Sequence, residues 1–359
     1  MTPPDRRPVL VTGGAGFIGS NIADRLAGEG EEVIIYDSLA RPGVERNLKW
    51  LEQRHGASIV PIIADVRNEG QVEGAVAKAK AVFHMAAQVA VTTSFSDPRA
   101  DLEVNMLGTF NVLEAARRCV SPPPVIFAST NKVYGGLEDV EFRLEGGAYH
   151  PAESTLREHG IDESRPLDFH TPYGCSKGAA DQYVLDYGRS FGVPTAVLRM
   201  SCIYGQRQMG TEDQGWVAHF LISAIEGRRI ILYGDGCQVR DILDVRDAVG
   251  AYLSVWRDID RLSGQAFNLG GGPDNAVSLH QILKFIGDYV GRQPLIDMAD
   301  WRAGDQRYFV ADTRKLQKAV DLKPRTPWQK GVADLAEWLL AERPEGKAVA
   351  APAMAARAL

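Results

Sequence analysis

Short apolar runs rich in β-branched residues alternate with longer segments of helical spacing through the first two hundred residues. This alternation is typical of a parallel sheet whose crossover helices cover both of its faces. The predicted strands are residues 8–12, 32–36, 58–64, 81–85, 125–129 and 195–199, and the longest predicted helices are residues 102–118 and 174–191. The pattern therefore predicts the α/β class, with a doubly wound parallel sheet.

The pattern becomes mixed after Arg199, where glycine, charged and aromatic residues are more frequent, and a further apolar run at 265–269 is placed to rejoin the sheet. We expect a first domain of residues 1–200, rejoined by about 238–269. A smaller, discontinuous substrate-binding domain is expected from residues 201–237 and 270–343. Residues 344–359 are rich in alanine and have no periodic apolar face, which predicts a disordered tail.

Composition excludes several classes of protein. The 359 residues are 45% hydrophobic and 24% charged, as in ordinary globular proteins. A net charge of -6 gives no basic footprint for nucleic acid. The four cysteines and seven histidines are scattered without metal-ligand spacing, so no metal is predicted. Because no apolar run is long enough for a signal sequence or a membrane span, we expect a cytoplasmic protein without membrane contact.

A glycine-rich turn follows the first predicted strand. Gly13, Gly16 and Gly19 precede a segment with one apolar helical face. In a Rossmann-type fold such glycines permit a tight turn, the approach of backbone to a pyrophosphate and close packing of helix on strand, while the helix N-terminus binds the anion. The triplet alone also fits an ordinary strand-to-helix turn. In this context it predicts a dinucleotide site.

Two carboxylates stand where the next two strands end. Asp37 lies 18 positions after Gly19. A carboxylate there accepts hydrogen bonds from both ribose hydroxyls and repels a 2′-phosphate, which favours NAD over NADP. Arg41 nearby keeps NADP open. Asp65 ends the third strand, where it is placed to contact adenine, although a turn residue is an equally good interpretation.

Tyr173 and Lys177 are four residues apart and therefore lie on one face of a predicted helix. A phenol is a poor base at neutral pH, but a neighbouring ammonium and a nicotinamide cation stabilise its phenolate, which then exchanges a proton with a sugar hydroxyl. Ser129 and Thr130 end the fifth strand, at the edge where open α/β sheets bind ligands, so Thr130 is placed to hydrogen-bond the reacting oxygen. Taken alone, Tyr173 and Lys177 also fit an ordinary amphipathic pair on a helix, and Ser129 and Thr130 also fit a capped strand end.

Taken together, the motifs resemble the extended short-chain dehydrogenase/reductase superfamily, whose members modify nucleotide-linked sugars. The resemblance rests on the order of the glycine triplet, Thr130, Val133-Tyr134-Gly135, Tyr173 and Lys177. Within the superfamily the chain is most similar to the CDP-tyvelose 2-epimerase (CDP-paratose 2-epimerase) family. That likeness extends over about residues 9–340 and is strongest in residues 88–94, 129–135, 167–183 and 213–216.

The resemblance implies roles for individual residues. It makes Thr130, Tyr173 and Lys177 catalytic. The residues that it implies for NAD binding are Gly13, Gly16, Phe17, Ile18, Gly19, Asp37, Asp65, Val66, Ala86, Ala87, Gln88, Asn105, Ser129, Tyr173 and Lys177. Those that it implies for substrate binding are Thr130, Asn131, Lys132, Arg240 and Arg302. The two arginines match residues that bind the substrate diphosphate, a role suited to a permanently charged, bidentate guanidinium.

Other reactions of the superfamily fit the chain less well. Dehydratases carry Asp-Glu after the Ser/Thr as the acid and base of an elimination, and Asn131 and Lys132 disfavour that reaction. A nucleotide-sugar 4-epimerase, of the UDP-glucose/galactose or uronate type, is a closer alternative because it uses the same Tyr, Lys and NAD. Against it, Cys202 stands where 4-epimerases usually carry Asn, and a long insertion, residues 136–165, precedes Tyr173. A non-catalytic NAD-binding sensor has no need of an activated phenol.

The expected reaction is therefore inversion at C2 of a CDP-linked deoxyhexose. Tyr173 takes the proton of the C2 hydroxyl while C2 passes hydride to tightly bound NAD, and the 2-keto sugar turns and receives the hydride on its other face. The insertion is expected to be either a surface loop or a cap over the sugar. Because helices 102–118 and 174–191 match a dimer interface of the superfamily, the resemblance also implies a homodimer or homotetramer.

Overall fold

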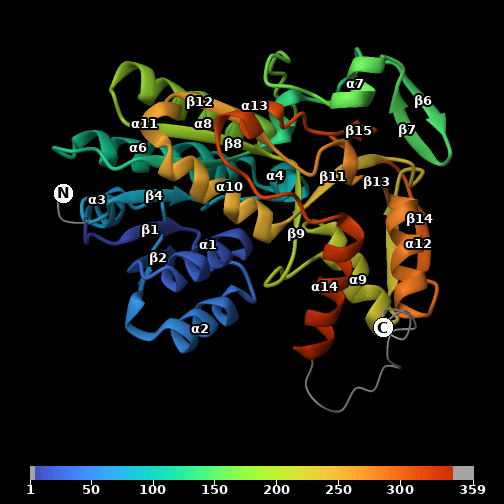
Figure 1. The fold of residues 1–359 in the computed structure, drawn as a ribbon, viewed down its shortest axis with the longest axis horizontal. Coiled ribbons are helices and arrows are strands. Elements are labelled where there is room, and N and C mark those ends of the chain that lie inside the picture. Colours follow the sequence, from blue (N-terminus) through green and yellow to red (C-terminus); the bar gives the residue numbers. More distant parts are fainter. Residues whose placement is uncertain (1–4, 343–359) are drawn as a thin grey trace.

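The computed structural model describes residues 5–342, and the predicted tail at 344–359 lies outside them. Its centre is a seven-stranded parallel sheet of order β12-β8-β5-β4-β1-β2-β3 (Figure 1). The strands are β1 (Val9–Thr12), β2 (Val33–Asp37), β3 (Ile59–Ile63), β4 (Ala81–His84), β5 (Val125–Thr130), β8 (Thr195–Met200) and β12 (Gln265–Leu269). All six predicted strands and the rejoining run 265–269 are confirmed to within one residue at each end, as is the predicted α/β class.

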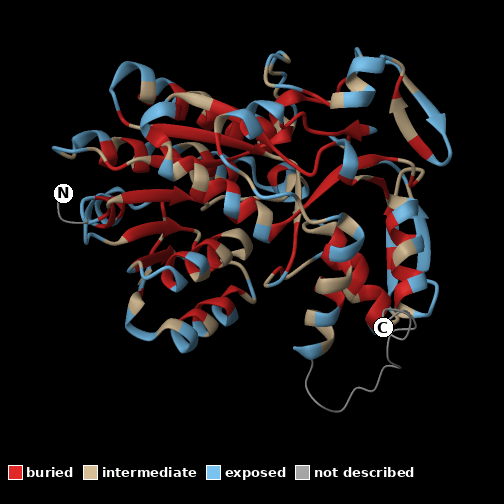
Figure 2. Ribbon diagram, in the orientation of Figure 1, coloured by how far each residue is buried: buried red, intermediate tan, exposed pale blue. Residues whose placement is uncertain are grey.

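Helices cover both faces of this sheet, which is why its strands read as continuous apolar runs. One face packs against α1 (Phe17–Gly28), α2 (Val44–His55) and α10 (Val245–Arg257), and the other against α3 (Glu69–Val76), α6 (Gly108–Arg118) and α8 (Thr171–Ser190). Within β1, Val9 and Val11 join the first core and Leu10 the second, as a side-chain period of two requires. Figure 2 shows the buried sheet between helices whose outer sides are exposed.

The predicted helix at 102–118 is built from three consecutive pieces. These are α5 (Pro98–Leu102), a π-helical turn, η2 (Glu103–Leu107), and α6. Its neighbour in the fold is α8, which matches the predicted helix 174–191 closely. Short helical segments also occur at α4 (Val91–Ser96), η1 (Gly56–Ser58), η3 (Asn131–Tyr134), η4 (Pro273–Asn275), α11 (Ile259–Leu262) and α13 (Arg314–Ala319).

A second, smaller lobe lies beside the sheet, on the right in Figure 1. Its core is formed by α9 (Trp216–Glu226), α12 (Leu279–Val290) and α14 (Trp328–Ala341), with the parallel pair β10 (Arg229–Tyr233) and β14 (Leu295–Ala299). A small sheet joins β9 (Cys202–Tyr204), β11 (Val239–Asp244), β13 (Ala276–Ser278) and β15 (Tyr308–Phe309). The chain thus leaves the small sheet after β11 and re-enters the large one through α10 and β12. The proposed domain boundaries stay a prediction.

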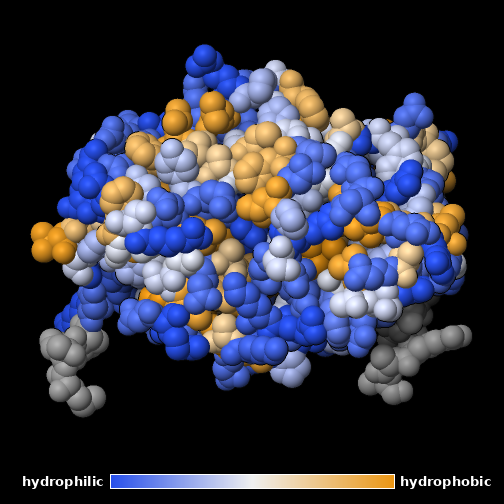
Figure 3. All heavy atoms as spheres, turned by 90° about the horizontal axis from the view of Figure 1, so that it is seen from above, coloured by the Kyte–Doolittle hydropathy of each residue, from blue (hydrophilic) through white to orange (hydrophobic). Residues whose placement is uncertain are grey.

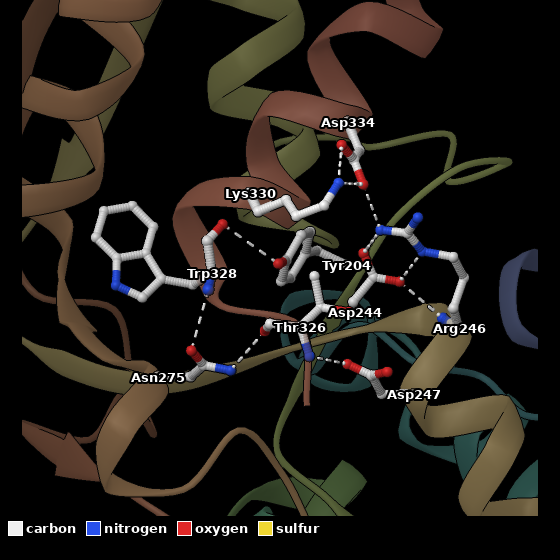
Figure 4. A network of polar contacts seen from close by, with 9 residues as sticks. All are labelled: Tyr204, Asp244, Arg246, Asp247, Asn275, Thr326, Trp328, Lys330 and Asp334. Carbon is white, nitrogen blue, oxygen red and sulfur yellow. Dashed lines mark hydrogen bonds and ion pairs between the residues drawn. The ribbon is translucent and has the colours of Figure 1, made fainter. Parts of the chain in front are cut away.

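A polar network fastens α14 to the junction between β11 and α10 (Figure 4). Asp244 accepts a hydrogen bond from the backbone of Arg246 and so caps α10. The Arg246 guanidinium binds Asp244 and also Asp334 of α14, at 2.7 Å in each case. Asn275 accepts a hydrogen bond from the Trp328 backbone at the start of α14. The second lobe is therefore held to the element that leads back into the large sheet.

The insertion at 136–165 folds into an antiparallel hairpin, β6 (Phe142–Glu145) and β7 (Ala148–Pro151), followed by α7 (Ser154–His159). The hairpin packs on the small sheet through β7. Tyr149 donates a hydrogen bond to the Asp235 carboxylate at 2.5 Å, and its backbone N–H binds the Cys237 carbonyl. The insertion therefore supports the loop between β10 and β11.

Apolar and hydrophilic side chains are interspersed on the face seen in Figure 3. Between residues 5 and 342, no helix combines the length and the apolar character that crossing a membrane would need.

Candidate active site

The turn from β1 into α1 has the geometry that a pyrophosphate requires. Gly13 has φ of +65°, and a Cβ there would lie 2.7 Å from the backbone nitrogen of Ala86. A Cβ on Gly19 would collide with the carbonyl oxygen of Gly13. Gly16 precedes α1 without any side-chain cap, so the first N–H groups of the helix remain available to an anion. A dinucleotide phosphate fits this turn, whose close backbone contacts a side chain at any of the three glycines would crowd.

The two predicted carboxylates have different surroundings. Asp37 accepts hydrogen bonds from the backbone N–H groups of Ala15, at 3.0 Å, and Leu39, at 2.9 Å. Burial nevertheless raises the pKa of Asp37 above its ordinary value, against the effect of these bonds. Asp65 is already bound by Arg67, whose Nη2 lies 2.7 Å from Oδ2, and the pKa of Asp65 is lowered by that contact. Asp37 thus lies at the glycine turn and is held by backbone N–H groups, whereas the carboxylate of Asp65 is paired with Arg67.

The remaining predicted cofactor residues lie behind this edge. Ala86 follows β4 and faces Gly13, and its N–H reaches the Thr12 hydroxyl at 3.3 Å. The N–H of Gln88 donates to Asn105, whose side chain is fully buried. These contacts fix residues 86–88, Ala87 included, at the carboxyl ends of β1 and β4. Val66 is buried against Gly108 of α6.

A cavity of about 390 Å³ lies between the sheet and the second lobe. The predicted residues on its wall are Phe17, Ile18, Ser129, Thr130, Asn131, Lys132, Tyr173, Arg240 and Arg302. Those that do not border it are Gly13, Gly16, Gly19, Asp37, Asp65, Val66, Ala86, Ala87, Gln88, Asn105 and Lys177. The predicted substrate residues therefore share one cavity, while most predicted cofactor residues belong to the adjoining glycine turn and strand ends.

No residue of the insertion 136–165 lines this cavity. The expectation that the insertion is a cap over the sugar is therefore not met. Phe142 of the hairpin is half-buried and packs against Tyr308 of the small sheet instead. Of the two interpretations the surface loop is the one that agrees with the structure.

Thr130 and Tyr173 meet at the floor of the cavity. Thr130 ends β5 beside Met200 of β8, and its hydroxyl accepts the Lys132 N–H at 3.2 Å. Tyr173 lies in the first turn of α8. Burial raises the pKa of Tyr173 to about 12, while a hydrogen bond with Thr130 acts in the opposite direction. The phenol is therefore protonated at neutral pH in the chain by itself.

Lys177 lies one turn further along α8, 2% exposed, with Nζ 4.1 Å from the centre of the Phe127 ring. Burial lowers the pKa of Lys177 to about 7, although Asp181 and Asp101 favour its charged form. That the ammonium and a nicotinamide cation together stabilise the phenolate stays a prediction; in the chain itself desolvation is the largest influence on the pKa of both groups.

Both predicted phosphate-binding arginines are paired with carboxylates. Arg240, 7% exposed, binds Asp305 at 2.6 Å. Arg302 binds Glu212 at 2.9 Å and lies over the Tyr233 ring, 3.7 Å from its centre. An anionic ligand at either guanidinium would share or replace these partners.

Several cavity residues escaped the sequence analysis. Gln208 and Gln238 are 8% and 1% exposed, and neither Oε1 has a hydrogen-bond partner among residues 5–342. Their amide nitrogens are fixed by the carbonyls of Ile203 and Tyr233. Unpartnered buried acceptors favour a ligand with hydroxyl or amino donors. Gln238 lies two residues before Arg240, and this position in the sequence could have identified it as a site residue. Nothing in the sequence around Gln208 marks it in the same way.

The fold and the site define a Rossmann-type, dinucleotide-dependent enzyme with a cavity between the large sheet and the second lobe. Residues 9–270 match the model of the NAD dependent epimerase/dehydratase family. The chain belongs to this family and uses NAD as its cofactor.

Known proteins resemble the chain over nearly its full length. It is 41% identical to the CDP-paratose 2-epimerase of Salmonella typhi, over 92% of this chain and 98% of that protein. It is 30% identical to a putative UDP-glucose 4-epimerase of Methanocaldococcus jannaschii, over 92% and 98%. The solved UDP-glucose 4-epimerase of Thermus thermophilus, in complex with NAD, superposes with a TM-score of 0.79 at 30% identity, covering 94% of this chain and 100% of that one.

Proposed function

We propose that the protein is an NAD-dependent nucleotide-sugar epimerase that inverts C2 of a CDP-linked deoxyhexose, converting a CDP-paratose type of substrate to the CDP-tyvelose type. The observation that carries the proposal is the meeting of Thr130 and Tyr173 in a cavity that also holds Arg240 and Arg302. The 41% identity with a CDP-paratose 2-epimerase supports the choice of base and carbon.

NAD, when bound, supplies the hydride acceptor and donor together with a positive charge. Gly13, Gly16 and Gly19 with the start of α1 would hold its pyrophosphate, Asp37 its adenosine ribose, and Lys177 the ribose of the nicotinamide. Tyr173 accepts the proton of the C2 hydroxyl as C2 is oxidised and returns it when C2 is reduced on the other face. Thr130 orients that hydroxyl toward the phenol.

The substrate diphosphate is assigned to Arg240 and Arg302, with Asn131 and Lys132 beside the sugar. Lys132 donates to the Gly304 carbonyl at 2.9 Å, and burial lowers the pKa of Lys132 to about 8. Met200 and Cys202 give the wall next to Thr130 an apolar character, which suits the C–H edges of a deoxysugar. The free amide oxygens of Gln208 and Gln238 suit donors of the base or the remaining hydroxyls.

The reaction is tested by running it in deuterium oxide with CDP-paratose and following C2 by NMR. We expect a C2-inverted product without solvent deuterium at C2, since the hydrogen stays within the site as hydride. Deuterium at C2 would mean deprotonation of carbon and would overturn the mechanism. A panel of UDP-sugars in the same assay tests the 4-epimerase alternative, which predicts inversion at C4 instead.

The proposal includes self-association and a cytoplasmic location. Leu102, Leu107, Phe110 and Tyr183 are 49%, 47%, 37% and 45% exposed on the neighbouring segments α5, η2, α6 and α8. The rings of Phe110 and Tyr183 contact each other across α6 and α8. Large apolar side chains gathered on adjacent helices favour an interface, so we infer a homodimer, or a homotetramer built from it, through this helical face.

A further inference from the structure

A buried ion pair lies behind the catalytic face of α8. Asp181 is fully buried and Arg199, from β8, is 5% exposed. Arg199 donates from Nε to Oδ2 and from Nη2 to Oδ1 of Asp181, both at 2.9 Å. Ser129 donates to Oδ2 at 2.7 Å and Gln182 to Oδ1 at 2.9 Å. Both oxygens of the carboxylate are therefore occupied.

Lys177 precedes Asp181 by four residues on the same helix, a spacing at which lysine and aspartate ordinarily pair. Lys177 nevertheless forms no ion pair with any residue of the described stretch 5–342, and its Nζ lies over Phe127. The other nearby carboxylate, Asp101, is occupied as well. It accepts hydrogen bonds from Ser176 at 2.5 Å, Gln88 at 2.9 Å and Asn105 at 3.1 Å.

We propose that Arg199 is a positioning residue of the active site: by binding both oxygens of Asp181 it keeps that carboxylate from capturing Lys177. The ammonium then remains free to act on Tyr173 and on a ligand. The inference rests on the proposed function for the role of Lys177 in the reaction. The electrostatic effect of the Asp181–Arg199 pair on Lys177 does not depend on that function. Ser129, next to Thr130, ties the same pair to the end of β5.

The charged and titratable groups around Lys177 come from four elements. Tyr173 and Asp181 share α8 with it, Asp101 faces it from α5, His84 from β4, and Arg199 lies beyond Asp181 on β8. His84 is neutral, since burial lowers its pKa to about 3. Arg199 therefore carries the positive charge that balances Asp181, and changing either partner changes the field at Lys177 in a known direction.

The two halves of the pair have opposite effects in this arrangement. Arg199→Met leaves the Asp181 carboxylate unbalanced beside Lys177, which stabilises the ammonium and raises its pKa, by about one pH unit. Asp181→Asn leaves the Arg199 charge unbalanced and lowers the pKa of Lys177. The double variant removes both charges and brings the pKa of Lys177 back toward the wild-type value. A role confined to packing, without an electrostatic effect on Lys177, gives no such reversal of sign.

The test is an NMR titration of the full chain with ¹³C-labelled lysine, with the Lys177 resonance assigned by its loss in Lys177→Arg. Shifts of opposite sign in Arg199→Met and Asp181→Asn support the proposal, and shifts of one sign, or none, overturn it. Arg199→Met leaves a buried charge unpaired and can therefore fail to fold. In that case Asp181→Asn is compared with the double variant. A lowered Lys177 pKa in Asp181→Asn and a near wild-type Lys177 pKa in the double variant support the proposal, whereas equal values in the two overturn it.

The pH dependence of epimerase turnover is measured on the same NAD-loaded variants. An alkaline limb that moves with the Lys177 pKa supports the role of Lys177 in the proposed reaction. If the NMR shifts occur and the limb stays in place, the effect of Arg199 on Lys177 stands and the function assigned to Lys177 is wrong.

Discussion

Substitution of Gly13 by alanine should damage both the fold and the dinucleotide site. The new Cβ would lie 2.7 Å from the Ala86 nitrogen and 2.8 Å from the Ala86 Cα, which are backbone atoms of the neighbouring strand end. The left-handed conformation, φ of +65°, costs a residue with a Cβ about 1–2 kcal/mol. Crowding against backbone adds about 1–3 kcal/mol. The sum, about 2–5 kcal/mol, is a large part of the ~5–15 kcal/mol by which a protein is usually stable.

Urea unfolding and NAD titration of the purified variant measure this cost. If the turn keeps its conformation, the free energy of unfolding falls by the amount above. If the turn moves away from Ala86 to relieve the crowding, the loss appears in NAD affinity instead, because the pyrophosphate cradle is displaced. Every 1.4 kcal/mol corresponds to about tenfold in the binding constant.

Gly28→Ala, at the end of the helix that follows this turn, is the matched control. No atom lies within 4 Å of a Cβ at Gly28, and its φ is not positive. We expect unchanged NAD affinity and a stability change between zero and a gain of about 1 kcal/mol. The steric reasoning is refuted if Gly13→Ala matches wild type in both measurements to within about 0.5 kcal/mol, or if the control loses as much as Gly13→Ala.

Other substitutions test the site, the insertion and the interface. Tyr173→Phe and Thr130→Ala should lower kcat by about 10²–10⁴-fold while NAD stays bound; a Tyr173→Phe enzyme with normal turnover would assign the proton transfer elsewhere. Glu212→Gln should lower the KM of the nucleotide sugar by up to about fivefold, because it removes one of the charges paired with Arg302, a half-exposed contact worth at most about 1 kcal/mol, and leaves the contact with Asp213; a raised KM would contradict diphosphate binding there. Tyr149→Phe removes the hydrogen bond to Asp235 and should lower the free energy of unfolding by about 1 kcal/mol. It should also raise KM more than it lowers kcat; unchanged KM and stability would show that the insertion does not support the β10–β11 loop. Phe110→Asp should shift the protein toward the monomer in analytical ultracentrifugation, whereas an unchanged mass would place the interface on another surface.

The sequence determined the large sheet, the glycine turn and the alignment of Tyr173 with Lys177. These features depend on local periodicity and spacing: alternating apolar runs, glycines three apart, and two side chains one helical turn apart. Each is written within a short stretch of chain. The same is true of Asp37, which follows directly from the end of a strand.

Only the tertiary structure decided which partners the charged groups take. Asp305 binds Arg240 and Glu212 binds Arg302 across 65 and 90 residues, and the insertion faces the small sheet rather than the cavity. Asp181 has a lysine at helical spacing, yet it pairs with an arginine from a strand. Burial likewise raised the pKa of Tyr173 and lowered that of Lys177. Contacts between distant segments, and the desolvation that comes with them, follow from packing of the whole chain and leave no local pattern in the sequence.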